Sequence, residues 1–194
     1  MEGSKDEKKA KIIQLSIETI RKHGIKKTTI EDIANASGMA PASIYYYFSN
    51  KKELLRAAVS TIMNTVFDGI EIAVKSPCSP EEKLISTWKA IFLEANKSGF
   101  FLNLDMRVRS QLMMIAGEIV DEFDRRHKAL VRKILLEGKK QGVFHVDDIE
   151  MTSTFLSNGV WGLILNTVDH GKMELTEAWV DELGKLLMNG LKKR

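Results

Sequence analysis

The residues whose chemistry is easiest to assign carry hydroxyl and ammonium groups and lie in one short stretch of the chain. All three tyrosines are consecutive, at positions 45–47, with Thr28 and Thr29 before them and Lys51 and Lys52 after them. Tyrosine and threonine hydroxyls donate hydrogen bonds to phosphate oxygens, and lysine neutralises phosphate charge. This combination indicates a surface that binds a polyanion such as nucleic acid.

Groups with the spacing of a catalytic or metal-binding site do not occur in the sequence. The four histidines, at positions 23, 127, 145 and 170, do not pair at the spacing of a metal site, and Cys78 is the single cysteine. The sequence also has no glycine-rich phosphate loop and no nucleophile-elbow motif. It therefore predicts no metal, no cofactor and no catalytic residue, and an all-helical enzyme is the least favoured interpretation.

Composition and charge narrow the class of protein further. Residues 1–56 hold 11 Lys and Arg against 7 Asp and Glu, whereas residues 57–194 hold 18 against 19. A basic N-terminal part suggests a nucleic-acid partner, although a solvated basic tail over Lys5–Lys11 is the alternative. No apolar run reaches the ~18 residues of a membrane span, and the charged N-terminus is unlike a secretory signal. A cytoplasmic protein without a membrane partner is expected.

Helical spacing of apolar residues recurs along the chain, and the alternation of β-strands does not. The sequence predicts an all-α fold of about nine helices. The first four are expected at about residues 6–23, 29–37, 41–48 and 51–75, and five more at about 80–99, 100–109, 115–141, 147–170 and 176–194.

Helices two and three are joined by the tight turn Ser37–Gly38–Met39, which is the layout of a helix-turn-helix. Ile44 and Phe48 are four residues apart and are expected to pack inward, which leaves other side chains of helix three for the major groove. The alternative for Tyr45 and Tyr46 is packing on helix one. The candidate DNA contacts are Thr28, Thr29, Pro41, Ala42, Ser43, Tyr45, Tyr46, Tyr47, Lys51 and Lys52.

The same region resembles the tetracycline-repressor (TetR) family of bacterial regulators over about 50 residues. The matching residues are Gly24, Thr28, Thr29, Ile30, Asp32, Ile33, Ala34, Ser37, Gly38, Ser43, Ile44, Tyr45, Tyr47, Phe48, Lys51 and Leu54. The sequence departs from the family pattern at Ala40, Ala42, Ile20 and Ile25, where serine, glycine and aromatic residues are common. The resemblance implies a helix-turn-helix domain over residues 1–50 and a helical ligand-binding and dimerisation domain over residues 51–194.

Candidates for the two functions of residues 51–194 come from aromatic, methionine and glycine residues. The ligand-pocket candidates are Trp88, Phe92, Phe101, Met106, Met113, Phe123, His127 and Asn158. The candidates for a homodimer interface on the last two helices are Phe155, Gly159, Gly162, Leu163, Trp179, Leu183 and Leu187. The alternative in both cases is that these stripes only cover the core of one chain.

The leading interpretation is a ligand-responsive, DNA-binding transcriptional regulator. The resemblance implies a repressor that binds a near-palindromic operator as a dimer, with reading helices ~34–36 Å apart. A small-molecule inducer bound among helices four to seven would tilt helix four and change that spacing. The alternative is a helical carrier of small molecules or lipids that does not bind DNA.

Overall fold

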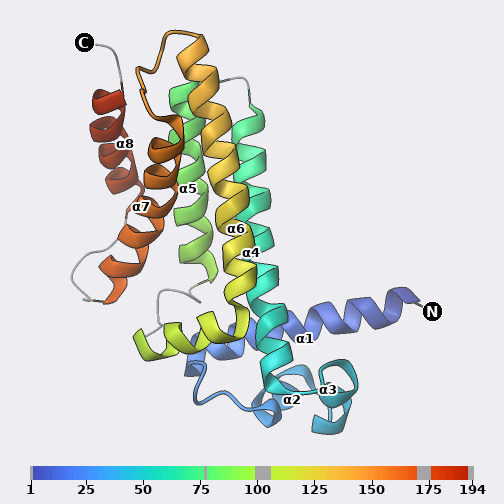
Figure 1. The fold of residues 1–194 in the computed structure, drawn as a ribbon. Coiled ribbons are helices and arrows are strands. Elements are labelled where there is room, and N and C mark those ends of the chain that lie inside the picture. The colour runs from blue at the N-terminus through green and yellow to red at the C-terminus, as the bar shows by residue number, and fades with distance from the viewer. Residues whose placement is uncertain (1, 77, 99–105, 170–175, 192–194) are drawn as a thin grey trace. The chain divides into compact units, whose positions relative to one another are not determined.

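The computed structural model describes residues 2–76, 78–98, 106–169 and 176–191. This part of the chain contains eight α-helices and no β-strand, which confirms the all-α fold (Figure 1). The helices are α1 (Glu2–His23), α2 (Ile30–Ser37), α3 (Pro41–Tyr47), α4 (Lys51–Lys75), α5 (Pro80–Ser98), α6 (Met106–Lys140), α7 (Ile149–Asp169) and α8 (Glu177–Leu191).

The helix count is one lower than predicted because α6 joins, across a kink, two helical segments in the region where two helices were expected. The segment from Met106 to Ile115 contains no proline or glycine, so the first segment runs without interruption to the kink. The change of direction is absorbed at Ala116, whose φ of −136° and ψ of 18° are non-helical. Gly117 follows at once, and small residues of this kind are common at helix kinks.

The chain divides into two compact units. Unit 1 comprises Met1–Met63 and Ser98–Val120, and unit 2 comprises Asn64–Lys97 and Asp121–Arg194. Helices α4 and α6, the second of them kinked at Ala116, contribute residues to both units. The functional division predicted from the sequence, at residues 50 and 51, stays a prediction.

Unit 1 is built on an apolar cluster that α1, α2 and α3 share with the start of α4. Its buried members are Ile12, Ile30, Ile33, Ala34, Ile44, Phe48 and Leu54. Helix α1 packs on α2, and α2 packs on α3. Three short helices thus fix one another through inward apolar faces and leave their polar faces to solvent.

The ends of α2 and α3 follow from local sequence. The Thr29 side chain accepts from the Asp32 amide, and the Asp32 carboxylate accepts from the Thr29 amide, which confirms the predicted capping box. Gly38 ends α2 in the left-handed region, with φ of 66°. Pro41 occupies the first turn of α3, but Ala40 before it supplies no side-chain cap.

Helix α4 is the one helix of the described residues that is long and apolar enough to cross a membrane by length and composition. The core helix of a folded domain passes the same test. The apolar residues of α4 that are buried in this structure are Leu54, Leu55, Ala58, Val59, Ile62, Met63, Val66, Phe67 and Ile70.

Unit 2 packs the rest of α4 and α6 with α5, α7 and α8. Val180, Gly184 and Met188 form the buried stripe of α8, and Gly184 lets the helix approach Ile85 of α5 closely. The Lys83 ammonium and the Glu137 carboxylate form an ion pair of 2.7 Å between α5 and α6. These contacts hold the helices that carry the candidate ligand and dimer residues.

Candidate nucleic-acid interface

The turn between α2 and α3 sets the direction of the reading helix. The amide of Met39 donates to the Ala34 carbonyl at 2.9 Å, which closes the turn at Gly38. Ile44 and Phe48 are fully buried, as the four-residue spacing predicts. Because α3 is anchored on this one face, its other side chains point outward.

The outward face of α3 carries most of the residues predicted to contact DNA. Tyr45 is 50% exposed and Tyr46 is 69% exposed, and Pro41 and Ala42 are exposed as well. The Tyr46 and Tyr47 rings meet edge to face, with centroids 5.0 Å apart. The partly buried candidates on α3 are Ser43 and Tyr47. Two exposed phenol groups on a short uncharged helix can donate to phosphates or base edges.

The two threonines before α2 occupy different environments. Thr28 is buried, and its hydroxyl donates to the Gly24 carbonyl at 2.9 Å, which ties the loop together. Thr29 is exposed, and its hydroxyl donates to Asp32 Oδ2 at 2.9 Å while it caps α2. These hydrogen bonds from Thr29 lower the pKa of the Asp32 carboxyl. Thr29 therefore organises the exposed N-terminus of α2, where backbone amides favour an anion.

The two lysines that begin α4 also differ. The Lys51 ammonium donates to the Ile25 carbonyl at 2.6 Å, and its partial burial lowers the pKa of this group. Lys51 thus fastens the start of α4 to the loop before α2. Lys52 is exposed and available to a phosphate.

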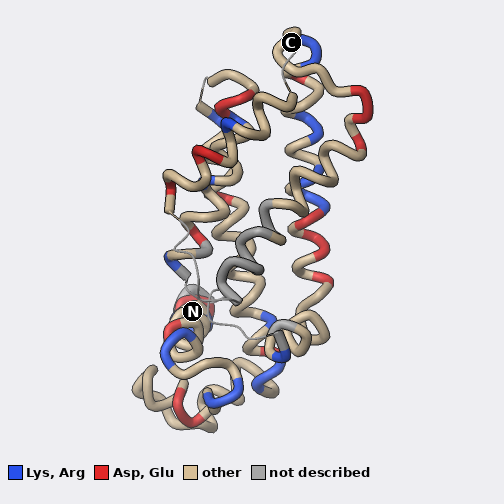
Figure 2. Tube along the Cα trace, turned by 90° about the vertical axis from the view of Figure 1, so that its left-hand side faces the viewer, with Lys and Arg blue, Asp and Glu red and all other residues tan. Residues whose placement is uncertain are grey.

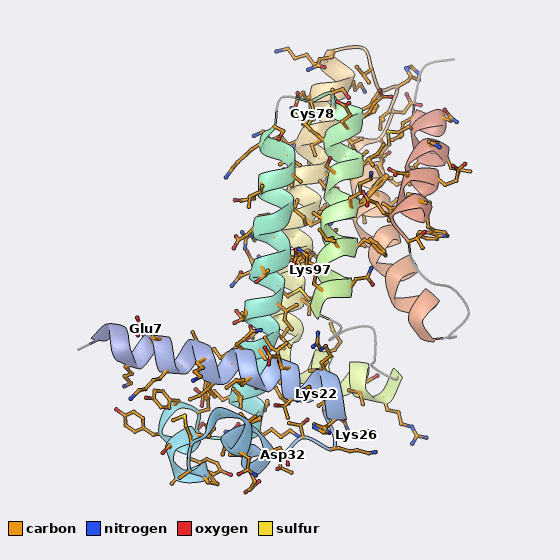
Figure 3. All side chains as sticks on the ribbon, turned by 180° about the vertical axis from the view of Figure 1, so that it is seen from behind. Glu7, Lys22, Lys26, Asp32, Cys78 and Lys97 are labelled. Carbon is orange, nitrogen blue, oxygen red and sulfur yellow. The ribbon has the colours of Figure 1, made fainter. Side chains whose placement is uncertain are left out.

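Further basic residues surround this surface, and the sequence alone did not single them out. Lys26 lies on the segment between α1 and α2, with Lys22 at the end of α1 and Asp32 on α2 (Figure 3). At the other end of α1, the Lys5 and Lys9 ammonium groups lie over the rings of Tyr46 and Phe48. Figure 2 marks the Lys and Arg positions along these helices. The sequence signal that could have identified Lys5 and Lys9 is their four-residue spacing, which places both on the helical face that continues the buried face of α1.

The ligand-pocket candidates in unit 2 include two buried polar side chains without partners. Trp88 and His127 are 0% exposed, and neither Trp88 Nε1 nor the two ring nitrogens of His127 has a hydrogen-bond partner. Burial lowers the pKa of His127 to about 4, so the imidazole is neutral at pH 7. Buried polar groups are normally paired, which makes these atoms candidate ligand contacts.

His127 lies beside a pair of aromatic rings. The His127 ring lies 6.0 Å from that of Phe123, which meets Phe67 edge to face at 6.1 Å. Phe92 is buried too, whereas Met113 and Asn158 are exposed. Phe101 and the Met106 side chain lie outside the described residues. Of the eight predicted pocket residues, four are therefore buried in unit 2, and two of these, Phe123 and His127, are in ring contact.

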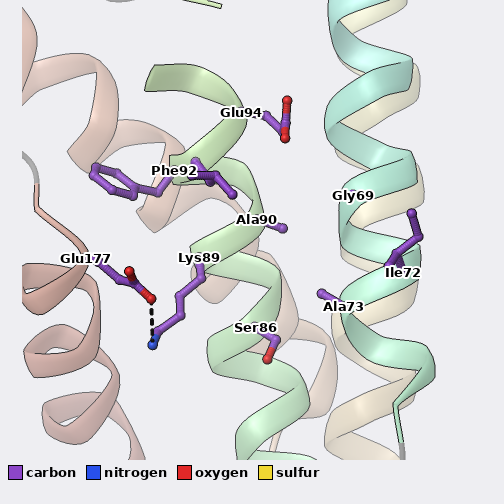
Figure 4. A pocket seen from close by; sticks show the side chains of 10 residues that line it. Gly69, Ile72, Ala73, Ser86, Lys89, Ala90, Phe92, Glu94 and Glu177 are labelled. Carbon is purple, nitrogen blue, oxygen red and sulfur yellow. Dashed lines mark hydrogen bonds and ion pairs between the residues drawn. The ribbon is translucent and has the colours of Figure 1, made fainter. Parts of the chain in front are cut away.

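One open groove of about 300 Å³ lies between α4 and α5 in unit 2 (Figure 4). Its lining is mainly apolar and includes Gly69, Ile72, Ala90, Phe92 and Leu93. The Lys89 ammonium at its edge pairs with Asp181 at 2.7 Å and with Glu177 at 3.4 Å. Phe92 is the one predicted pocket residue among its lining residues.

The dimer candidates lie on α7 and α8. Phe155 is 63% exposed, and a side chain built at Gly159 or Gly162 would meet open space. Trp179, Leu183 and Leu187 are half-buried beside the buried stripe of α8, and the Leu163 side chain is outside the described residues. Exposed apolar side chains on α7 and α8, with small residues on α7, are suited to close approach by another helix.

No group of three or more metal-binding side chains occurs among the described residues. The described residues offer two kinds of binding surface. One is an exposed face of hydroxyl and ammonium groups in unit 1, and the other is a buried aromatic and polar cluster in unit 2.

Comparisons with known proteins agree with this arrangement. Residues 12–58 match the family model described as bacterial regulatory proteins of the tetR family. The transcriptional repressor KstR2 of Mycolicibacterium smegmatis is 25% identical over 154 residues, which cover 77% of this chain and 74% of the relative.

Two solved structures share the fold along almost the whole chain. The fatty acid degradation regulator FadR from Bacillus halodurans has a TM-score of 0.77 at 23% identity, with 96% of this chain and 97% of that chain covered. FadR from Bacillus subtilis in complex with stearoyl-CoA has a TM-score of 0.73 at 20% identity, with 94% and 98% covered. The chain belongs to the TetR family and is a ligand-responsive, DNA-binding transcriptional regulator.

Proposed function

We propose that the protein is a repressor that binds a near-palindromic operator as a homodimer in the cytoplasm and leaves it when a small molecule binds. The observation that carries the proposal is the outward face of α3. Tyr45 and Tyr46 are exposed there while Ile44 and Phe48 anchor the helix in the core. A dimer would present two such helices to successive major grooves.

The dimer is supported by the exposed apolar face of α7 and α8. Large apolar side chains on a surface mark an interaction site when they lie together, and Met151, Phe155 and Leu186 are each more than 60% exposed. Gly159 and Gly162 leave room for a second helix. A Phe155→Glu variant should therefore sediment as a monomer at concentrations at which the unmodified protein is a dimer. A dimeric variant would contradict this interface.

For the ligand we infer an acyl compound with a long apolar chain and an uncharged carbonyl group. The support is the stearoyl-CoA complex of a fold relative, together with the burial of Trp88 and His127 and the Phe123 ring beside His127. The Trp88 N–H and a neutral His127 N–H are donors that a thioester carbonyl would satisfy. Paired in this way, the two side chains would no longer be buried without partners.

The coupling between ligand and DNA is supported by the course of α4 and α6. Each helix contributes residues to both units, and α6 bends at Ala116, where the backbone is non-helical. Within unit 1, Arg56 of α4 donates to the Ile115 carbonyl at 2.6 Å and pairs with Glu118 of α6. Two helices joined in this way would move as one body.

The test is DNA binding across a salt series, with a duplex from upstream of the protein's own gene and a scrambled duplex. Tight binding to the first duplex alone, with a steep salt dependence, is expected. Stearoyl-CoA should weaken that binding at least about tenfold, since allosteric coupling of this size is ordinary. Binding to neither duplex would favour the carrier interpretation, and binding that stearoyl-CoA leaves unchanged would exclude this acyl class.

A further inference from the structure

The first ten residues of α1 are a charged extension of the DNA-binding unit, with four lysines and three acidic residues. Helix α1 begins at Glu2, whereas the family match begins at residue 12. The intervening turns contain Lys5, Lys8, Lys9 and Lys11. This extension is helical and continuous with the part of α1 that packs on α2.

The lysines of the extension divide between two faces of α1. At 100° per residue, Lys5 and Lys9 fall on the same face as Ile12 and Ser16, which are fully buried. Lys8 and Lys11 lie on neighbouring faces that turn away from that direction. Glu7 projects on the side opposite α2 and α3 (Figure 3). The face of α1 that continues its core stripe therefore carries Lys5 and Lys9.

The contacts of this face lead directly to the reading helix. Lys5 Nζ lies 5.1 Å from the centroid of the Tyr46 ring, and Lys9 Nζ lies 5.4 Å from that of Phe48. Among the described residues, neither ammonium group forms a hydrogen bond or ion pair with a carboxylate. Lys9 contributes to lowering the pKa of Glu53, but that carboxylate is already held by the Ser49 amide and hydroxyl at 2.7 Å.

We propose that the first turns of α1 form a phosphate-binding site beside α3. In this site Lys5 and Lys9 contact phosphates of the DNA backbone next to the nucleotide that Tyr46 contacts. The aromatic rings hold the two ammonium groups at the rim of the reading surface without using their N–H donors. The exposed Tyr46 hydroxyl supplies a further donor at the same rim. The inference rests on the proposed DNA-binding function and adds an element outside the family match.

The experiment compares two double variants that remove the same charge from the same helix. The first is Lys5→Ala with Lys9→Ala, and the matched control is Lys8→Ala with Lys11→Ala. Both are titrated against a mixed-sequence 30-base-pair duplex across a salt series, because phosphate contacts do not depend on base sequence. Circular dichroism and thermal unfolding confirm that each variant is folded.

The first variant should lose about 0.9 of the log–log salt slope for each contact removed, or roughly 2 per protomer. Its affinity at 0.1 M salt should fall tenfold or more, whereas the control should keep most of its slope. Lys5→Arg with Lys9→Arg should restore the slope, since arginine also neutralises phosphate. Equal slopes for the first variant and its control would overturn the proposal.

Two further outcomes separate the causes. If Lys5→Ala with Lys9→Ala lowers the melting temperature and leaves the salt slope unchanged, Lys5 and Lys9 stabilise the packing of α1 on α3. This result would overturn the proposal but not the regulator function. If the unmodified protein binds no duplex even at low salt, the regulator function itself fails.

Discussion

Unit 1 and unit 2 keep their polar binding groups in opposite places. In unit 1 the hydroxyl and ammonium groups of α3 and its neighbours are exposed, and apolar residues anchor the helices from below. In unit 2 the polar atoms of Trp88 and His127 are buried without partners, and His127 lies beside the Phe123 ring. The difference matches the two kinds of partner. DNA is much larger than unit 1 and binds to an exposed surface. A small ligand is enclosed by the protein and must form hydrogen bonds with the polar groups that surround it.

The largest effect should come from the exposed face of α3. Tyr45→Ala with Tyr46→Ala removes two contacts from each reading helix, and each lost contact typically costs ~1–3 kcal/mol. Operator affinity should fall at least about 100-fold while the melting temperature stays within a few degrees, because both side chains are at least half exposed. Gel-shift titration and thermal unfolding measure the two quantities. A large drop in stability would mean that these tyrosines belong to the core.

The next effect concerns the buried histidine of unit 2. Burial lowers the folded-state pKa of His127 to about 4, whereas the pKa in the unfolded chain is about 6.5. Between these two pH values His127 is protonated in the unfolded chain and neutral in the folded chain. This contribution to stability is complete above pH 6.5 and is lost as the pH falls towards 4. The unfolding free energy should decrease by about 2 kcal/mol between pH 7 and pH 5 on this account.

His127→Leu supplies the comparison for that pH dependence. Urea unfolding at the two pH values should give the variant a smaller pH dependence and, at pH 7, a stability equal to or above that of the unmodified protein. Its DNA affinity without ligand should not change. An identical pH dependence in both proteins would show that His127 is charged or paired in the folded state.

A smaller effect is expected at the joint between α4 and α6. Arg56→Met removes the hydrogen bond to the Ile115 carbonyl and the ion pair with Glu118. Operator affinity without ligand should be nearly unchanged, whereas the ligand-induced loss of affinity should shrink about fivefold, or ~1 kcal/mol of coupling. Lys75→Met at the end of α4 is the control. If Arg56→Met keeps the full ligand-induced loss of operator affinity, the contacts of Arg56 with α6 do not contribute to the coupling between ligand and DNA.

The smallest effect should follow the loss of the α2 cap. Thr29→Ala removes the side chain that accepts from the Asp32 amide, and such N-cap losses cost ~1 kcal/mol. Chemical unfolding should detect this change, and Thr29→Ser should restore most of it. If Thr29→Ala weakens DNA binding far more than stability, the threonine hydroxyl also contacts a phosphate.

The sequence predicted unit 1 well because its signals are local. Gly38 permits the left-handed conformation that ends α2, and Pro41 favours the first turn of a helix. Ile44 and Phe48 share one helical face. The turn and the inward side of α3 therefore follow from residues close together in the chain. Helix α6 was harder because the break predicted between residues 109 and 115 is a kink at Ala116, beside Gly117, and not an interruption between two separate helices. A small residue permits either outcome, and contacts outside the segment decide between them.

The candidate sites show the same dependence on distant contacts. The core positions of Trp88, Phe92, Phe123 and His127 follow from helical spacing. The exposure of Met113 and Asn158 depends on how α6 and α7 are turned, which the spacing leaves open. Lys5 and Lys9 were visible only as part of a basic tail, since their significance comes from aromatic rings forty residues further along the chain.

The missing cap at Ala40 has a consequence for the dynamics of the reading helix. Helix α3 has seven residues, too few to be stable alone, and Ala40 provides no side-chain hydrogen bond at its start. Its order therefore depends on Ile44 and Phe48 remaining in the core, and the amides of α3 should exchange hydrogen with solvent sooner than those of α1. Bound DNA would slow that exchange, so the operator would complete the folding of the helix that reads it.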